Sequence, residues 1–287
     1  MNKAAISIAT AIALIGTRTF AADLAVKAPE YAPTVPAWSW TGFYVGGDIG
    51  AKELHDNWTA TSLFDGAGPA PGFPALPIDA SSPREFDPFS FRAGGYVGYN
   101  WQFSPIWVVG VEGDAAWADD SQTQSGLPGC SLNCVKGAVI TPSGLPSGGD
   151  SASVKMLWDA SARGRLGYLV TPDLLVYATG GVAWQNIEAS GQCGAYLSSA
   201  HCFTEGPNTI APSITQSATL TGWTVGVGLE GHVGGNWLLR AEYRFADFGS
   251  WGTSFPFVAV APVNNNTYRF SNAVQTQLGM LGVAYKF

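Results

Sequence analysis

The last fourteen residues, 274–287, carry the pattern that most restricts what this chain can fold into. Bulky apolar side chains alternate there with smaller or polar ones, down to the final residue. Because a β-strand sends successive side chains to opposite faces, this alternation predicts a strand with one large apolar face. The opposite face holds Met280, Gly282, Ala284 and Lys286, and the apolar face holds Leu281, Val283, Tyr285 and Phe287.

The same alternation recurs upstream in segments of roughly ten residues. Glycine is abundant (36 of 287 residues) and charged residues are few (12%), which suits an all-β chain with close backbone contacts and an apolar exterior. Past residue 21, no apolar stretch approaches the roughly 20 residues that a membrane-spanning helix needs. Together with the terminal strand, the predicted strands are 42–51, 95–103, 107–117, 155–168, 174–187, 220–233 and 237–248.

Aromatic spacing and connection lengths distinguish a membrane barrel from a soluble one. Trp107 and Trp117 share one face of a strand ten residues apart, about the length of tilted strand that crosses a bilayer. Trp158 and Tyr168 repeat this spacing. The connections also alternate in length: 104–106, 171–173 and 234–236 are short, whereas 52–93, 118–153, 188–218 and 249–273 are long and rich in Gly, Ser, Pro and Asn.

The predicted fold is therefore all-β: an eight-stranded antiparallel up-and-down transmembrane β-barrel with four long external loops. An even number of strands lets such a meander close on itself and leaves no open edge, which a membrane requires. A soluble, lipocalin-like barrel is the alternative. It would turn the apolar face inward and the charges outward.

The start of the chain predicts export. Residues 1–21 have a basic start at Lys3, an apolar run and small residues before a cut at Ala21/Ala22, as in a cleaved signal peptide. Residues 22–38 are rich in Pro and Ala, which predicts an extended linker, and the barrel takes 39–287. Cleavage removes two basic residues and no acid, so the net charge moves from −7 to −9. That acidity argues against a nucleic-acid partner.

Charged residues gather on the parity opposite the apolar face. An eight-stranded interior is just wide enough for side chains to fill, and buried charges persist only when they are paired. The sequence thus predicts an ion-pair network that plugs the lumen. The alternative is a narrow ion path lined by Arg163, Arg165, Arg240 and Arg244. The predicted network comprises Asp48, Glu112, Asp114, Lys155, Asp159, Arg163, Arg165, Glu230, Arg240, Glu242, Arg244 and Lys286.

Four cysteines lie in two of the long links. In an exported protein the prior expectation is disulfides, and local pairing of Cys130 with Cys134 and of Cys193 with Cys202 needs the least coincidence. A zinc site near His201 is the alternative, but the spacings are not those of known zinc modules. We expect no cofactor, no metal and no catalytic residue, because no nucleophile–base arrangement is visible.

The strands resemble those of a known family. SWTGFYVGGDIG (39–50), GGYVGYNWQF (94–103), WVVGVEGD (107–114), ARGRLGY (162–168), YATGGVAW (177–184), TGWTVGVGLE (221–230), WLLRAEYRFADFGS (237–250) and LGVAYKF (281–287) follow one another in order. They are similar to the alphaproteobacterial outer-membrane immunogenic protein family, among the small eight-stranded outer-membrane barrels. The long links are not part of the resemblance.

This resemblance implies a location in the outer membrane, with membrane lipid and the barrel-assembly machinery as partners. It also implies that the apolar face of Leu281, Val283, Tyr285 and Phe287 is the assembly signal. We expect a non-enzymatic protein with a structural and surface role in the cell envelope. Two alternatives remain: a small porin that passes ions or small solutes, and an adhesin or receptor that binds a host or surface ligand through its loops.

Overall fold

The computed structural model describes residues 38–63, 77–130, 139–140, 146–147, 149–192, 213–259 and 264–287. Residues 1–37, with the predicted signal peptide and most of the predicted linker, lie outside this part. No helix within it is long and apolar enough to cross a membrane. Eight long strands form one ring: β1 (Gly42–Leu63), β3 (Phe89–Gln102), β4 (Trp107–Ser125), β7 (Ser151–Thr171), β8 (Leu174–Gln192), β9 (Ser213–Gly234), β10 (Trp237–Ala259) and β11 (Asn264–Lys286).

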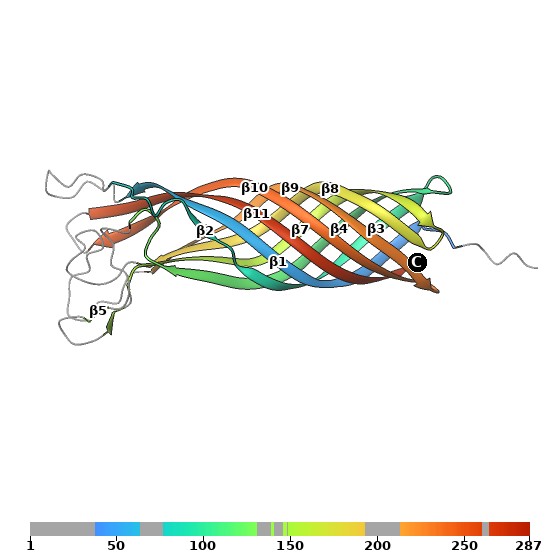
Figure 1. Ribbon diagram of the computed structural model, residues 1–287, viewed down its shortest axis with the longest axis horizontal. Helices are drawn as coiled ribbons and strands as arrows, with labels where there is room; N and C mark the ends of the chain where they lie inside the picture. Colours follow the sequence, from blue (N-terminus) through green and yellow to red (C-terminus); the bar gives the residue numbers. More distant parts are fainter. Residues whose placement is uncertain are drawn as a thin grey trace, which may run out of the picture. The chain divides into compact units, whose positions relative to one another are not determined.

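The ring closes between its first and last strands (Figure 1). Neighbours pair in the order β11-β10-β9-β8-β7-β4-β3-β1, and β11 pairs back onto β1, all antiparallel. The closing seam runs from Tyr44 opposite Lys286 to Leu63 opposite Tyr268. A short strand, β2 (Arg84–Phe86), extends the pairing of β1 beyond β3, and β5 (Val139–Ile140) pairs with β6 (Pro146–Ser147) separately. The predicted eight-stranded antiparallel barrel is confirmed.

The outer wall of the ring is apolar between two aromatic girdles. Near the short turns, the Trp107 and Tyr168 rings lie 5.3 Å apart. Toward the long links, Trp117 faces outward with 69% of its surface exposed, and it stands opposite Trp158 in the register. Branched aliphatic residues such as Val111, 64% exposed, occupy the wall between the girdles. This arrangement places the hydrocarbon of a bilayer around the middle of the wall.

The strands run well beyond the outer girdle, which differs from the sequence prediction. β1 continues twelve residues past Ala51 to Leu63, and β11 begins at Asn264, where a long loop was predicted. The polarity of the two faces is exchanged in this extension, although the strand keeps its parity. Leu54 and Trp58 face inward, while Glu53 and His55 face outward. Water surrounds the wall above the lipid, so the extension follows the polar-out, apolar-in rule of soluble sheets. We predicted loops there because the prediction looked for apolar side chains on the outward face only, and here they lie on the inward face.

An aromatic cluster fills the extended part of the barrel. Trp58 stacks on Phe270 with ring centroids 4.3 Å apart, and both side chains are at most 1% exposed. The indole N–H of Trp58 donates to the hydroxyl of Tyr268 (3.0 Å), which donates to the backbone carbonyl of Pro128 (2.9 Å). Phe86 of β2 is fully buried in the same cluster. Above the membrane, the molecule therefore has the packed apolar core of a soluble barrel.

We expect charge on the lipid-facing wall to be costly and charge on the extension to be tolerated. Val111→Arg, placed between the girdles of β4, should lower the free energy of unfolding from lipid by about 2–4 kcal/mol. Ser121→Arg, an exposed position further along the same strand, should change it by less than about 0.5 kcal/mol. Denaturant unfolding of the barrel in lipid vesicles measures both values. Equal losses would mean that the boundary of the lipid band is misplaced.

A charged lumen as the candidate functional site

Between the girdles, the inside of the barrel is occupied by charged side chains. Six acids and six bases from six strands point inward, each with at most 6% of its surface exposed. They form one continuous network of ion pairs across the lumen. Its members are Asp48, Lys52, Arg92, Glu112, Asp114, Asp159, Arg163, Arg165, Glu230, Arg240, Glu242 and Arg244.

Arg92 of β3 holds the half of the network nearer the extension. One guanidinium nitrogen lies 2.5 Å from Asp48 Oδ1, and the other lies 2.6 Å from Asp114 Oδ2 and 2.8 Å from Asp159 Oδ1. Lys52 completes this half with Nζ 2.7 Å from Asp159 Oδ2. One guanidinium thus binds carboxylates from three different strands, which its planar fork of donors allows.

Glu112 of β4 organises the half nearer the short turns. Its carboxylate accepts from Arg163 Nη2 at 2.5 Å and from Arg240 Nη1 at 2.6 Å. Arg163 also contacts Glu242, and Arg244 bridges Glu242 (3.2 Å) and Asp114 (3.0 Å), which joins the two halves. Arg165 pairs with Glu230 at 2.9 Å and lies 3.8 Å from Glu112, which connects this last pair to the network.

Three tyrosines complete the charged layer, and each lies over a glycine of a neighbouring strand. Tyr44 donates to Glu112 Oε2 (2.8 Å), and Tyr177 donates to Glu242 Oε2 (2.7 Å). The Tyr96 ring lies 3.5 Å from the guanidinium carbon of Arg240, a cation–π contact.

Glycine is required where these rings lie, because a Cβ has no room there. At Gly98 it would come within 2.3 Å of the Tyr44 hydroxyl, at Gly46 within 2.4 Å of Tyr96, and at Gly228 within 2.4 Å of Tyr177. Gly228 belongs to the G-x-G-x-x-G run 226–231, which therefore lies within a strand and makes space for an inward side chain.

Trp40 closes the barrel at the end of the short turns. Its side chain is 1% exposed and packs with Leu169, Leu175 and Leu238 inside the ring. Its indole N–H donates to the backbone carbonyl of Pro172 (3.0 Å) in one of the short turns. The segment entering β1 is thereby anchored beneath the charged layer.

The structure brings together ten of the twelve residues predicted for the network and places the other two elsewhere. Lys155 faces outward and pairs with exposed Asp119 at 3.1 Å, because an irregularity between Met156 and Asp159 reverses the parity of β7. Lys286 lies at the mouth with Nζ 4.7 Å from the Trp38 ring, which stacks on the imidazole of His232 at 3.8 Å.

Lys52 and Arg92 replace those two lysines, so the predicted balance of six acids and six bases holds with different members. Both were missed because the range 52–93 was predicted to be a loop. A signal was present: Phe89 and Phe91 continue the outward parity of Val97, which puts Arg92 on the inward face.

Other predicted residues have these places. Leu281, Val283, Tyr285 and Phe287 lie on the outward face of the terminal strand or just after it. Cys130 is buried beside the aromatic cluster and does not carry a free thiol. Its predicted partner Cys134, together with Cys193 and Cys202, lies outside the described residues, so the pairing stays a prediction. His201 of the alternative zinc site is outside them too.

The chemical capacity of this lumen is electrostatic. Each carboxylate of the network faces at least one arginine or lysine, whereas Asp56, buried in the extension, accepts from the Asn272 amide at 2.8 Å. Beside Lys52 and Asp159 the interior leaves a cavity of about 20 Å³, which has room for a single water molecule.

Comparison with known proteins agrees with this geometry. A family model described as "Outer membrane protein beta-barrel domain" matches residues 19–287. A 31 kDa outer-membrane immunogenic protein of Brucella melitensis is 31% identical over 252 residues, covering 84% of this chain and 86% of its own. This chain belongs to the outer-membrane β-barrel family. It is an outer-membrane protein, and the short turns are accordingly periplasmic while the extension and long loops are external.

More distant relatives cover the barrel to a similar extent. A 25 kDa outer-membrane immunogenic protein of Brucella melitensis is 24% identical over 99% of this chain and 98% of its own. Among solved structures, Neisserial surface protein A matches 86% of this chain and 98% of its own, with 15% identity and a TM-score of 0.39. The named family resemblance and the outer-membrane location predicted from the sequence are confirmed.

We predict that Arg92 is far more important for stability than Lys155. Arg92→Met leaves three buried carboxylates without their shared cation, so the barrel should lose about 3–5 kcal/mol of unfolding free energy. Lys155→Met breaks an exposed pair and should cost less than about 1 kcal/mol. Denaturant unfolding in lipid measures both.

Arg92→Met combined with Asp48→Asn should recover part of the loss, because Arg92 is the ion-pair partner of Asp48, whereas Asp159 keeps Lys52 and Asp114 keeps Arg244. Similar stability of the two single variants would show that water solvates the lumen and that the charges do not depend on their partners.

Proposed function

We propose that this protein is a structural barrel of the outer membrane that keeps its lumen closed and presents its external loops at the cell surface. The observation that supports this most directly is the continuous ion-pair network across the lumen. Two arginines that would line an ion path, Arg163 and Arg240, are engaged by carboxylates on other strands. A side chain held in this way obstructs the lumen and does not attract a passing ion.

The lumen is blocked at three successive levels along the barrel, which supports the same proposal. The Trp40 layer lies on the periplasmic side, the charged layer within the membrane, and the aromatic cluster around Trp58 in the extension. A solute would have to disrupt three layers with different chemistry, two apolar and one charged. A porin needs a wet path, and an eight-stranded ring packed at all three levels offers no width for one.

The extension gives the surface role a physical basis. Strands that continue beyond the lipid around a packed apolar core form a stiff base for the loops. We therefore infer that this base serves to present the long links at the cell surface, where they can meet a host or surface ligand. We also propose no catalytic activity, because the carboxylates of the ion-pair network are neutralised by neighbouring arginines and lysines.

Planar-bilayer recording of the refolded protein tests the closed lumen. The wild type should show only rare and small conductance steps. Trp40→Ala should behave in the same way, because the charged layer still blocks the path after the periplasmic layer is removed. A steady, ion-selective conductance of the wild type would replace the structural proposal with the small porin.

We also propose that the terminal strand guides assembly of the barrel. Phe287 is 70% exposed, and its ring packs edge-on against Tyr285 at 5.3 Å, outside the wall. Its backbone N–H donates to the carbonyl of Phe43 (2.8 Å) across the seam, so the backbone takes part in closing the ring while the side chain stays exposed. An apolar row ending in an exposed aromatic is a surface that the barrel-assembly machinery can recognise.

Deleting Phe287 should lower the amount of barrel in the outer membrane several-fold, because recognition fails, while refolding in detergent changes little. Phe287→Tyr is the matched control, since it keeps an aromatic end. Cell fractionation and heat-modifiable mobility on gels give the two readouts. Normal membrane levels after the deletion would place the assembly signal elsewhere.

A further inference from the structure

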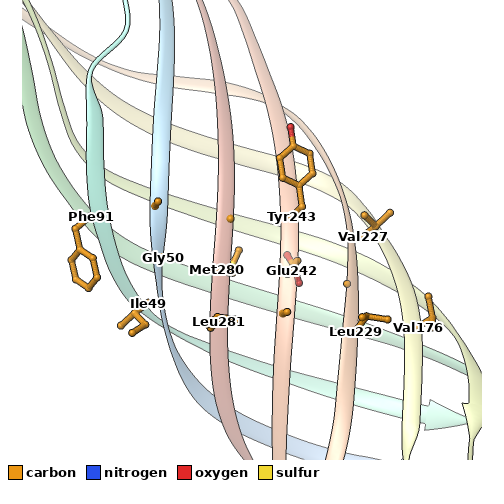
Figure 2. Close-up of a pocket in the computed structure, with 14 residues that line it drawn as sticks. Ile49, Gly50, Phe91, Val176, Val227, Leu229, Glu242, Tyr243, Met280 and Leu281 are labelled. Carbon is orange, nitrogen blue, oxygen red and sulfur yellow. The ribbon is translucent and has the colours of Figure 1, made fainter.

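The lipid-facing wall has a groove on its outside, which plays no part in closing the lumen. It has a volume of about 800 Å³ and spreads over six adjacent strands, β3, β1, β11, β10, β9 and β8 (Figure 2). That size lies within the usual range for sites that hold small molecules. Most of the wall of a barrel is convex, so a hollow of this size depends on a particular set of side chains.

Small residues form the floor of the groove and large ones form its rim. Ala51 stands opposite Gly279, and Ala241 lies diagonally from Gly279 on β10, beside Tyr243, which stands opposite Gly279. A Cβ added to Gly279 would meet nothing within 4 Å. Figure 2 shows the bulky side chains around this floor: Ile49, Phe91, Tyr243, Leu229 and Leu281.

One end of the groove meets polar side chains at the outer edge of the lipid band. Gln277 lies two residues from Gly279 and stands opposite Glu53, and both belong to the outward parity. The hydroxyl of Tyr243 donates to Gln277 Oε1 at 2.9 Å. The groove itself ends at Ala51, Gly279 and Tyr243, and Gln277 and Glu53 adjoin this end on the external side, at the depth of the outer leaflet.

We propose that this groove binds an outer-leaflet lipid, with its acyl chains on the floor and its polar linkage against Tyr243, Gln277 and Glu53. The occupant comes from the membrane itself, because this wall is the established lipid interface. Glu53 is acidic and exposed, so the adjoining part of the lipid is a hydroxyl or amide that donates hydrogen bonds, and not a bare phosphate. The Gln277 amide can donate to it in turn.

A second copy of the chain fits the groove less well. A two-fold interface places the same patch on both partners, so two hollows would face each other and leave a void. An acyl chain can adapt to a concave floor, because it is flexible and thinner than a packed strand. The inference depends on the outer-membrane location and is independent of whether the lumen conducts.

Photo-crosslinking with two lipid probes tests the site. One probe is a ceramide and the other a phosphatidylglycerol, each with a diazirine in the acyl chain, added to the purified full-length protein in detergent. In the wild type, saturable crosslinks should map to 237–248 and 274–287, with the ceramide at least threefold more efficient. Gly279→Leu fills the floor and should lower this labelling about tenfold. Gly164→Leu is the matched control, since Gly164 also faces outward and a Cβ there would meet only the Gly180 carbonyl oxygen at 3.9 Å, but it lies on β7.

Three other results of these labelling experiments would contradict the proposed lipid site or its polar edge. Labelling that does not saturate, or that is equal in the wild type and both variants, would show ordinary contact with bulk lipid and overturn the site. A wild-type dimer that Gly279→Leu converts to a monomer would assign the groove to a second copy. Equal labelling by the two probes would overturn the role of the polar edge, and Tyr243→Phe, which should remove the ceramide preference, checks that role separately.

Discussion

Closure of the ring between β1 and β11 is the constraint on which the rest of this structure depends. Within hydrocarbon, a backbone N–H or C=O has no water to bond, so each must find its partner in a neighbouring strand. The seam from Tyr44 to Leu63 satisfies this requirement for the two strands that would otherwise be edges. Once the ring is closed and its outer wall is apolar, every inward residue must fill a narrow space that lipid cannot enter.

The inward charges solve that filling problem in a way that also defines the two faces. Apolar residues on both parities would leave little to distinguish inside from outside, since a one-residue slip moves a whole set of side chains to the other face. A charged inward set makes such a slip prohibitive. The energetic benefit of buried pairs is modest, because desolvation offsets attraction, but breaking one is costly. The network around Arg92 and Glu112 thus contributes more to specificity than to net stability.

Along their length the strands pass through two environments, lipid around the lower part of the wall and water around the extension. On β1, Ile49 faces lipid and Asp48 faces the lumen, whereas further along Trp58 faces the inside and His55 faces water. The position of this inversion sets the outer edge of the membrane on the molecule. The groove over Gly279 lies just below that edge, so the wall changes from apolar to polar where a lipid does. The groove is therefore apolar where acyl chains lie and adjoins polar side chains where the polar part of an outer-leaflet lipid lies.

The sequence by itself determined the class of fold, because a period of two and a ten-residue aromatic spacing are local properties of single strands. It also predicted twelve charged residues with the inward parity, of which ten lie in the lumen. The tertiary structure decided that Lys155 and Lys286 lie outside the lumen and that Lys52 lies within it, whereas the alternation of Phe89 and Phe91 around Arg92 was already a local signal. A single irregularity after Met156 reverses the parity of β7, which turns Lys155 outward. Above the lipid the apolar side chains change to the inward face, so strand was predicted there as loop. The partners of each charge depend on strands far apart in sequence, and the groove depends on small residues that become neighbours only across the closing seam. No local pattern carries either kind of information.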